Sequence, residues 1–238
     1  MARPNGVVIA SERFWAFSAT GGRLVEGVMP RPPRLVARIP LVRGLARLAL
    51  ALSPIVHRTG TARRIERIGL LAAILMSFGL VFLPHRVSLI AGAALTLALL
   101  VLLFRGRTLS LHGAEHRAIA AAEERRLAAT WAGDARPSRF SPRCGTNFAA
   151  LAAPVTLLAD RVWPFPLAVW TPLAVMMLSL ALTMELWQAV QDSGSRFARV
   201  FLLPGLALQR ITTREPSLEE TRVALRAVAS VLSREAAS

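Results

Sequence analysis

The arginines of this chain avoid four long apolar segments, and this asymmetry is the strongest constraint on its fold. Arg86 and Arg161 lie in the short turns between paired segments. The other 27 of the 29 basic residues, all arginine, divide as 12 in residues 1–67, 8 in 105–145 and 7 in 192–238. Arginine is retained on the cytoplasmic side of inserted membrane proteins. If all four segments cross a bilayer, the three arginine-rich stretches share the cytoplasmic face. The segments are Ile68–Leu83, Val87–Phe104, Thr146–Ala159 and Val162–Met184.

The four segments differ in whether they are long enough to cross a bilayer. A hydrocarbon core of about 30 Å needs about 20 helical residues. Val162–Met184 meets that length, Val87–Phe104 nearly does, and Ile68–Leu83 is marginal. Thr146–Ala159 has 14 residues and is therefore either re-entrant or a short full span.

We therefore predict an all-α polytopic protein of the cytoplasmic (inner) membrane, with about four transmembrane helices in two hairpins, a cytoplasmic cap and cytoplasmic termini. Tight turns make the paired helices antiparallel. The predicted units are a cytoplasmic arm with an interfacial amphipathic helix (1–67), a first hairpin (68–104), a cytoplasmic helical loop (105–145), a second hairpin (146–191) and a cytoplasmic C-terminal helix (192–238).

Within the arm, two stretches differ in character. Residues 1–33 are typical of extended chain, with a short strand at Val7-Val8-Ile9 and a break at Gly21-Gly22. Residues 34–57 alternate arginine with leucine, isoleucine and valine at helical spacing. That helix either lies in the membrane interface with its arginines at the headgroups, or packs against the transmembrane bundle.

The other cytoplasmic stretches contain recognisable helix signals. Ser110 is a candidate N-cap for a helix in the 105–145 loop, which should stop near Gly133. Ser217 and Glu220 form an S-x-x-E capping box at the start of an amphipathic tail helix.

The formal charge of +15 does not by itself indicate a nucleic-acid partner. A DNA-binding surface gathers its basic residues on one folded face, whereas here they bracket apolar spans. The predicted partners are the lipid bilayer and a membrane protein partner, with no nucleic acid; the oligomeric state is open. Cys144 is the single cysteine, so the chain forms no disulfide within itself.

The sharpest local motif is His112-Gly113-Ala114-Glu115-His116. Four residues advance a helix by about 400°, so the two imidazoles point the same way, about 6 Å apart along the axis. Such a pair can share a zinc ion, and H-x-x-E-H is the pattern of the inverted zinc peptidases. Glu115 is the candidate base that would polarise a metal-bound water. The alternative is a pair of surface histidines beside a glutamate.

A catalytic zinc needs a third protein ligand, which must come from another segment. Glu123 lies seven residues past His116, about 10.5 Å along the helix, which is too far to share the ion. It would pair with an arginine instead. The candidates on the same membrane face are Glu26, Cys144, Glu185 and Glu215.

Two of these candidates have competing interpretations. Glu185 closes an apolar run and either binds metal or reaches the cytoplasmic interface by snorkelling. Arg143 and a helix N-terminus would lower the pKa of Cys144 and favour its thiolate, as a ligand or a nucleophile. A small buried cysteine without chemistry is the alternative.

Taken in order, four blocks resemble the YqhQ-like family of bacterial membrane proteins (domain of unknown function 1385). They are GGRLVEGVMPR at 21–31, HGAEHRAIAAAE at 112–123, PRCGTNF at 142–148 and LQRITTREP at 208–216. The resemblance implies several membrane spans and a predicted metal-dependent enzyme. Two positions depart from the family pattern, Ser141 where histidine is usual and Ala122 where an aromatic residue is usual.

Carried over by motif, the positions of interest form one set. They are Glu26, His112, Glu115, His116, Glu123, Cys144, Thr213, Arg214 and Glu215, with Glu185 as a looser match. All lie in stretches assigned to the cytoplasmic face, so we expect the motifs to converge above the membrane hairpins. If the histidine replaced by Ser141 is a ligand elsewhere in the family, this site has lost one.

The leading hypothesis is a metal-dependent hydrolase at the membrane surface, with a divalent metal such as zinc held by His112 and His116 and with Glu115 as base. The competing hypothesis is a membrane assembly or scaffolding factor without turnover, in which the same residues make structural contacts. A small-solute transporter is less favoured, because four spans without internal charge offer little to line a polar pathway.

Overall fold

The computed structural model describes residues 1–56, 83–103, 107–165, 170–193 and 195–238, together with Ala168 and four residue pairs between 68 and 80. The chain is mostly helical, and it also contains a small antiparallel sheet. The first predicted apolar segment, Ile68–Leu83, lies partly outside the described residues.

The first 28 residues form a four-stranded meander, so the prediction of an all-α fold is wrong for this part. Its strands are β1 (Ala2–Arg3), β2 (Gly6–Ala10), β3 (Phe14–Ala19) and β4 (Leu24–Val28), each antiparallel to the next. β-Branched and aromatic residues in β2 and β3 favour the pleated conformation. Gly22 at φ 85° makes the turn into β4. The short strand expected at Val7–Ile9 is part of β2.

The helices follow in chain order after the sheet. They are α1 (Arg34–Arg38), α2 (Val42–Val56), α4 (His85–Leu103), α5 (Thr108–Glu123), α6 (Leu127–Ala132), α7 (Gly145–Arg161), α8 (Thr171–Asp192), α9 (Arg196–Val200), α10 (Leu203–Thr212) and α11 (Leu218–Ala236).

Helices α5 and α11 pack on one face of the sheet and form the main hydrophobic core. Val7 and Ile9 of β2 face this core, whereas Val8 faces the opposite side with Trp15 and Phe17. The core face of α5 is built from alanines at 114, 118 and 121, all fully buried, which lets α11 approach closely. We refer to β1–β4, α5, α6 and α11 as the cap.

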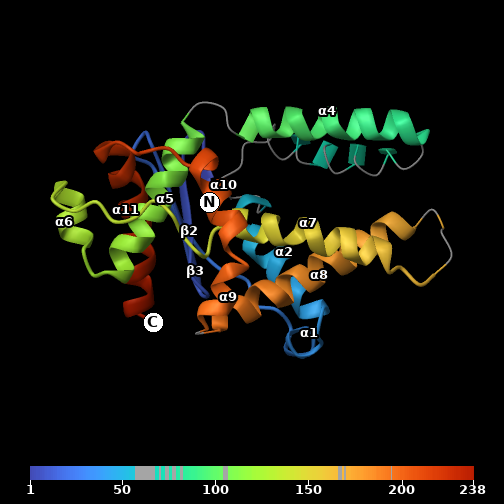
Figure 1. The fold of residues 1–238 in the computed structure, drawn as a ribbon. Helices are drawn as coiled ribbons and strands as arrows, with labels where there is room; N and C mark the ends of the chain where they lie inside the picture. Colours follow the sequence, from blue (N-terminus) through green and yellow to red (C-terminus); the bar gives the residue numbers. More distant parts are fainter. Residues whose placement is uncertain are drawn as a thin grey trace.

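Helices α7 and α8 pack against each other, with α2 against α8 and α10 against α7. Helices α4, α7 and α8 extend away from the cap in one general direction, whereas α10 lies beside the cap (Figure 1). The side-chain amide of Gln191, at the end of α8, donates to the Pro142 carbonyl just before α7 over 2.8 Å. The pair is therefore an antiparallel hairpin whose open end meets the cap.

The fourth predicted segment is displaced in the structure. Helix α8 begins at Thr171 rather than Val162 and continues to Asp192. Pro172 lies in its first turn, where proline is tolerated, and the residues from Trp163 to Phe165 are not helical because Pro164 interrupts the run. A hydropathy pattern does not detect these interruptions of the helix, because the run stays apolar.

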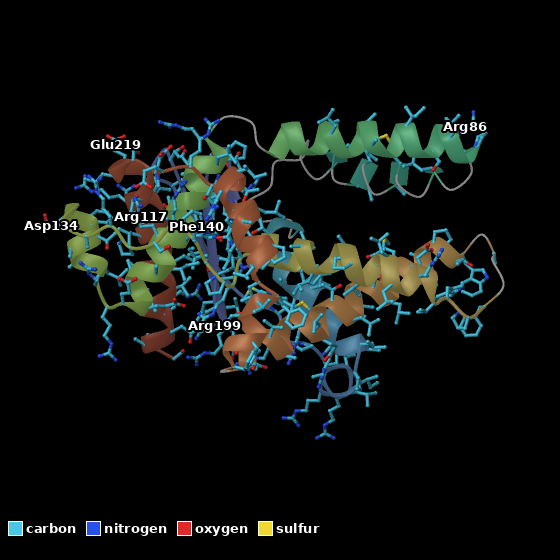
Figure 2. The ribbon with its side chains drawn as sticks, viewed as in Figure 1. Arg86, Arg117, Asp134, Phe140, Arg199 and Glu219 are labelled. Carbon is cyan, nitrogen blue, oxygen red and sulfur yellow. The ribbon has the colours of Figure 1, made fainter. Side chains whose placement is uncertain are left out.

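By length and composition, one described helix is able to cross a membrane, α8 with 22 residues. The apolar stretch found within α4, Arg86–Leu95, is shorter than the length required of a membrane span. Figure 2 shows Arg86 at the end of α4 that is remote from the cap.

Helix α2 lies against α8, which is the second of the two placements considered for it. A Cβ on Gly44 would lie 2.9 Å from the Ala181 carbonyl oxygen, so the backbones of the two helices approach closely. The guanidinium of Arg43 donates to the Glu185 carboxylate with Nε–Oε1 at 2.8 Å and Nη2–Oε2 at 2.5 Å. This pair fixes α2 on α8.

The cap helices follow their predicted signals in part. The capping box of Ser217 and Glu220 is present at the start of α11, as predicted. Ser110 is not an N-cap, because α5 already begins at Thr108. The single predicted helix is broken at Arg125, at φ 56°, and resumes as α6, which ends at Gly133 in the left-handed conformation.

Candidate metal centre

Three side chains with ligand chemistry meet where the cap joins the hairpin. They are His112 and His116 on α5 and Cys144, the residue immediately before α7. Their ligand atoms all lie within 4.8 Å of one another, and the Nε2 of His112 lies 3.2 Å from the Cys144 Sγ. His116 and Cys144 are buried, at 3% and 7% exposure. Among the four candidates for a third ligand, Cys144 is the one that the structure brings to the two histidines.

Both imidazoles are oriented by backbone carbonyls. The Nδ1 of His112 lies 2.8 Å from the Thr212 carbonyl oxygen, and the Nδ1 of His116 lies 2.7 Å from that of Arg139. A carbonyl only accepts hydrogen bonds, so each Nδ1 carries the proton and donates. Each Nε2 is left for the interior of the cluster. Histidines that bind metals usually donate their other ring N–H in this way.

Cys144 occupies a position that stabilises a thiolate. It is the N-cap of α7, and its Sγ accepts from the Thr146 backbone N–H at 3.4 Å and from the Thr146 hydroxyl at 3.2 Å. Burial alone raises the pKa of the Cys144 thiol, but interactions with His112 and His116 outweigh it and lower the pKa to about 5. The sequence predicted a lowered pKa but attributed it partly to Arg143, whereas the histidines supply it.

The charge on His112 is coupled to this thiolate. Burial lowers the pKa of His112, yet its hydrogen bond to Cys144 and the charges of Glu115 and Cys144 raise it on balance above the usual value. The pair therefore tends toward a thiolate beside an imidazolium. The two rings of His112 and His116 also meet edge to face, with centroids 4.5 Å apart.

A buried amide network positions the loop that carries Cys144. Gln209 of α10 brackets Ser141, accepting from its N–H and donating to its carbonyl, each over 2.8 Å. The Asn147 amide donates to the carbonyls of Ser141 and Pro142 at 3.0 and 2.7 Å. Gln209 and Asn147 are both fully buried. A Cβ on Gly205 would lie 2.1 Å from the Asn147 Oδ1, so glycine allows α10 to approach α7 at this point.

A second glycine lets the chain between α10 and α11 lie against α5. A Cβ on Gly113 would lie 2.2 Å from the Arg214 carbonyl oxygen. The Arg214 N–H in turn donates to the Leu109 carbonyl over 3.0 Å. The central glycine of the HGAEH motif thus explains how the HGAEH and TTREP motifs come together.

Glu115 lies beside the cluster and its carboxylate is largely buried. Its Oε1 accepts from the Met1 ammonium at 2.6 Å, while its Oε2 is buried without a partner among the described residues. Burial raises the pKa of Glu115, but the positive charges of Met1 and His112 lower it on balance. The carboxylate is therefore ionised at neutral pH.

Two of the proposed metal ligands are engaged elsewhere, so their assignment as ligands is corrected. Glu26 on β4 accepts a hydrogen bond from the Ser230 hydroxyl of α11. Glu185 binds Arg43 and accepts from the Leu41 N–H at 3.3 Å, so it fastens α2 to α8. Neither belongs to the ligand cluster among the described residues.

The remaining motif residues support the surroundings of the cluster. Glu123 pairs with Arg143, in agreement with the expectation that it binds an arginine. Glu215 pairs with Arg117 at 2.7 Å instead of offering a ligand. Thr213 is buried, and its hydroxyl donates to the Gln209 carbonyl over 2.6 Å.

Arg214 contributes to the site through its backbone, because its N–H and carbonyl lie along α5, while the residue as a whole is exposed. Sequence reasoning missed several residues that orient the ligands, namely Thr212, Arg139, Asn147 and Gln209. Thr212 and Arg139 act through carbonyls, which have no side-chain signature. Asn147 and Gln209 lie inside the PRCGTNF and LQRITTREP blocks, which is the signal that could have found them.

Chemically, two imidazole Nε2 atoms and a thiolate form a donor set for a borderline-soft divalent ion. The same thiolate beside a histidine has the elements of a cysteine nucleophile. Three motifs that are far apart in the chain, HGAEH, PRCGTNF and LQRITTREP, meet in this arrangement. GGRLVEGVMPR lies in the sheet and the chain that follows it, with Glu26 directed to α11.

Comparison with known proteins adds one finding. A family model described as "Protein of unknown function (DUF1385)" matches residues 105–234, which include α5, α7, α8 and all three residues of the cluster. No curated protein and no solved structure matches the chain. With more than half of its length covered, the chain belongs to the DUF1385 family.

Proposed function

We propose that this chain is a membrane-anchored metalloprotein in which His112, His116 and Cys144 bind one divalent ion, with zinc preferred. The observation that carries the proposal is the convergence of three ligand atoms within 4.8 Å. Two donors on one tetrahedral zinc, at about 2.0–2.3 Å each, are about 3.5 Å apart. The separation of 3.2 Å between the His112 Nε2 and the Cys144 Sγ is close to that value.

The donor set also suits a reactive centre. Catalytic zinc sites use three protein ligands and keep a fourth position open. A zinc ion so bound lowers the pKa of a coordinated water to about 7, which supports hydrolysis of a peptide, ester or phosphoester. We infer that the centre acts as a hydrolase on a substrate at the membrane surface.

The surrounding residues have defined parts in this proposal. The carbonyls of Thr212 and Arg139 hold the imidazoles so that each Nε2 faces the cluster. Cys144 is already a thiolate at neutral pH, because its pKa is about 5. No proton therefore has to leave the sulfur when an ion binds. The unpartnered Oε2 of Glu115 is available to accept a proton from water. Its lowered pKa makes it a weaker base than a group titrating near 7.

The topology proposed with this function has four spans and cytoplasmic termini. Helix α8 has spanning length, and α7, with 17 residues, is at the lower limit for a span. Apolar side chains on α4 and α7 point outward, with Ile90 and Leu157 each 73% exposed. Residues 68–83 would complete the first hairpin. The arginine distribution then puts the cluster on the cytoplasmic face.

The metal content of purified protein tests the centre. We expect about one equivalent of zinc, iron or manganese per chain after gentle extraction, and less than about a tenth of an equivalent in Cys144→Ser or His116→Ala. Glu26→Gln and Glu185→Gln are matched controls, because these carboxylates were candidate ligands that the structure pairs elsewhere; both should retain the metal. A wild-type protein without metal would refute the proposal.

Cobalt substitution adds a readout of the donor set. A thiolate-to-cobalt charge-transfer band should appear in the wild type and disappear in Cys144→Ser. Binding of cobalt without that band would show that Cys144 is not a ligand.

A second candidate function is an assembly factor without turnover. One observation favours it: the cluster links α5, α7 and α10 through hydrogen bonds that need no ion. Thermal stability with and without a chelator separates the two. If the wild type is unaffected by the chelator and His116→Ala misfolds, the residues are structural. A chelator-sensitive wild type with a folded, metal-free His116→Ala favours the metal centre.

A further inference from the structure

Helices α9 and α10 carry an apolar surface that the rest of the described chain leaves uncovered. Phe197 is 85% exposed, Phe201 54% and Ile211 68%. These values are high for large apolar side chains that lie close together along the chain. We call these positions the α9–α10 surface; its other members are Val200, Leu203 and Leu208.

The polarity of α10 is inverted relative to a helix in water. Its buried positions are Gly205, Gln209 and Thr212, which face α7 and the loop before it. Its exposed positions include Leu203 and Ile211. A helix on the surface of a water-soluble protein buries its apolar side and exposes its polar side. The arrangement in α10 therefore favours an apolar environment on its outer side.

The connection to α8 limits where this surface can lie. α8 ends at Asp192 and α9 begins at Arg196. Four residues of extended chain reach at most about 14 Å. If α8 spans the membrane, α9 begins at its surface. Figure 1 shows α9 and α10 at the end of the α7–α8 hairpin that meets the cap.

The charge of the segment complements an anionic surface. Residues 193–212 contain three arginines and no acidic residue. Arg199 and Arg210 are exposed, and neither makes an ion pair with a described residue. Figure 2 shows Arg199 at the junction between the hairpin and the cap. An arginine near an anionic leaflet contributes about 1 kcal/mol of binding, and guanidinium groups bind phosphate well.

We propose that α9 and α10 lie in the headgroup layer of the membrane, with the α9–α10 surface inserted among acyl chains and with Arg199 and Arg210 on the phosphates of anionic phospholipids. This inference rests on the membrane topology of the proposed function. It does not depend on metal binding.

The lipid contact bears directly on the candidate metal centre. Gln209 on α10 holds the loop that leads to Cys144, and the Thr212 carbonyl holds His112. The centre therefore lies about one helix diameter, roughly 10 Å, from the lipid surface. A substrate that is itself linked to lipid would reach it along that surface.

Hydrogen–deuterium exchange of the full-length protein in nanodiscs tests the proposal. Exchange across residues 196–212 should be at least about fivefold slower in phosphatidylglycerol than in phosphatidylcholine. In the double variant Arg199→Gln/Arg210→Gln this difference between lipids should vanish. In Phe197→Ser/Phe201→Ser the segment should exchange rapidly in both lipids.

The matched control is Arg222→Gln/Arg226→Gln, which removes the same charge from the cap, where both arginines stack on Trp131. This control should keep the wild-type lipid dependence. Equal exchange of the wild type in both lipids, or equal effects of the two arginine pairs, would overturn the proposal. Protection that appears only with two protein copies per nanodisc would assign the surface to a second copy of the chain.

Metal content measured on the same samples separates the two proposals. A protein without metal that still shows lipid-dependent exchange refutes the metal centre alone. A protein with metal whose exchange ignores the lipid refutes the lipid contact alone.

Discussion

The cap and the hairpin expose different kinds of side chain, although both are built mainly from helices. In the cap, α11 buries valine, leucine and alanine and exposes arginine and glutamate. In the hairpin, α8 buries Ser179 and Thr183 at 1% and 0% exposure, while Met177 and Leu182 are exposed at 38% and 39%. The exposed side of α8 is thus almost entirely apolar, whereas that of α11 also carries charged residues.

This difference is what we expect if the hairpin lies in lipid, as we propose, and the cap lies in water. In water, burial of apolar surface is favourable, so a helix in water buries its leucines. Lipid gives no such driving force, and helices in membranes place small and polar residues at their contacts. The hydroxyls of Ser179 and Thr183 donate to carbonyls four residues earlier in α8, at 2.6 Å each, so they are satisfied without water. The candidate metal centre lies where the two kinds of packing meet.

The largest expected effect is the lowered pKa of the Cys144 thiol, where the cap meets the hairpin. An ordinary thiol titrates near 8.5, whereas here the pKa is lowered to about 5, so the native state holds the thiolate. Stability from this group is fully present above the unfolded pKa of about 8.5 and is lost as the pH falls toward about 5. Thiolate absorbance of metal-free protein, followed from pH 9 to pH 4 against Cys144→Ser, measures it.

A midpoint above about pH 8 would contradict this prediction, because it would mean that His112 and His116 do not stabilise the thiolate. The junction would then resemble an ordinary buried cysteine. The lowered pKa of Cys144 is a feature of neither region alone, since the histidines come from α5 in the cap and the cysteine precedes α7 in the hairpin.

The next prediction compares the cost of introducing a carboxylate at two leucines of similar exposure. Leu182 lies midway along α8 at 39% exposure, and Leu232 lies on α11 at 44%. Leu182→Asp should oppose membrane insertion by about 3 kcal/mol, because a carboxylate at the centre of a span is costly. Leu232→Asp should change stability by less than about 0.5 kcal/mol, since surface substitutions in water are usually mild.

The fraction of each variant recovered in the membrane, and its melting temperature in detergent, measure the contrast. Equal tolerance of both substitutions would remove the distinction between the two regions. It would also remove the membrane topology on which the lipid contact of α10 rests.

The sequence predicted those parts of the fold that depend on local signals. The capping box at Ser217 and the end of the loop helix at Gly133 are both present. Apolar runs found the hairpin helices, but not their ends, because hydropathy does not register the prolines before α8. The sequence predicted only one short strand of the sheet, at Val7–Ile9. The strands that pair with it could not be predicted, because pairing depends on contacts between separate segments of the chain.

The residue types of the candidate site were recognisable in the sequence, but the way in which the residues come together was not. Helical spacing brought His112 and His116 together, since both lie on one helix. The third ligand depends on how α7 packs near α5, a long-range contact, so Glu26, Glu185, Glu215 and Cys144 were equivalent candidates in the sequence. The packing brings Cys144 to the two histidines, whereas Glu185 pairs with Arg43. The carbonyls that orient the imidazoles belong to residues whose side chains are irrelevant to the task.

The smallest of the three effects concerns two glycines, one in each region. A Cβ on Gly113 in the cap would lie 2.2 Å from the Arg214 carbonyl oxygen, whereas a Cβ on Gly145 at the start of α7 would meet nothing within 4 Å. Gly113→Ala should therefore push the chain between α10 and α11 away from α5, at a cost of about 1–3 kcal/mol. Gly145→Ala should be neutral or slightly stabilising, because alanine is the better helix former.

Thermal unfolding of both variants checks this prediction, and metal content extends it. The segment displaced in Gly113→Ala follows directly on Thr212, whose carbonyl orients His112, so this variant should also lose metal affinity while Gly145→Ala retains it. Full stability and full metal content in Gly113→Ala would show that the HGAEH and TTREP motifs are not held together by backbone contact. The glycine would then have no packing role in the cap, and the junction would depend on side chains alone.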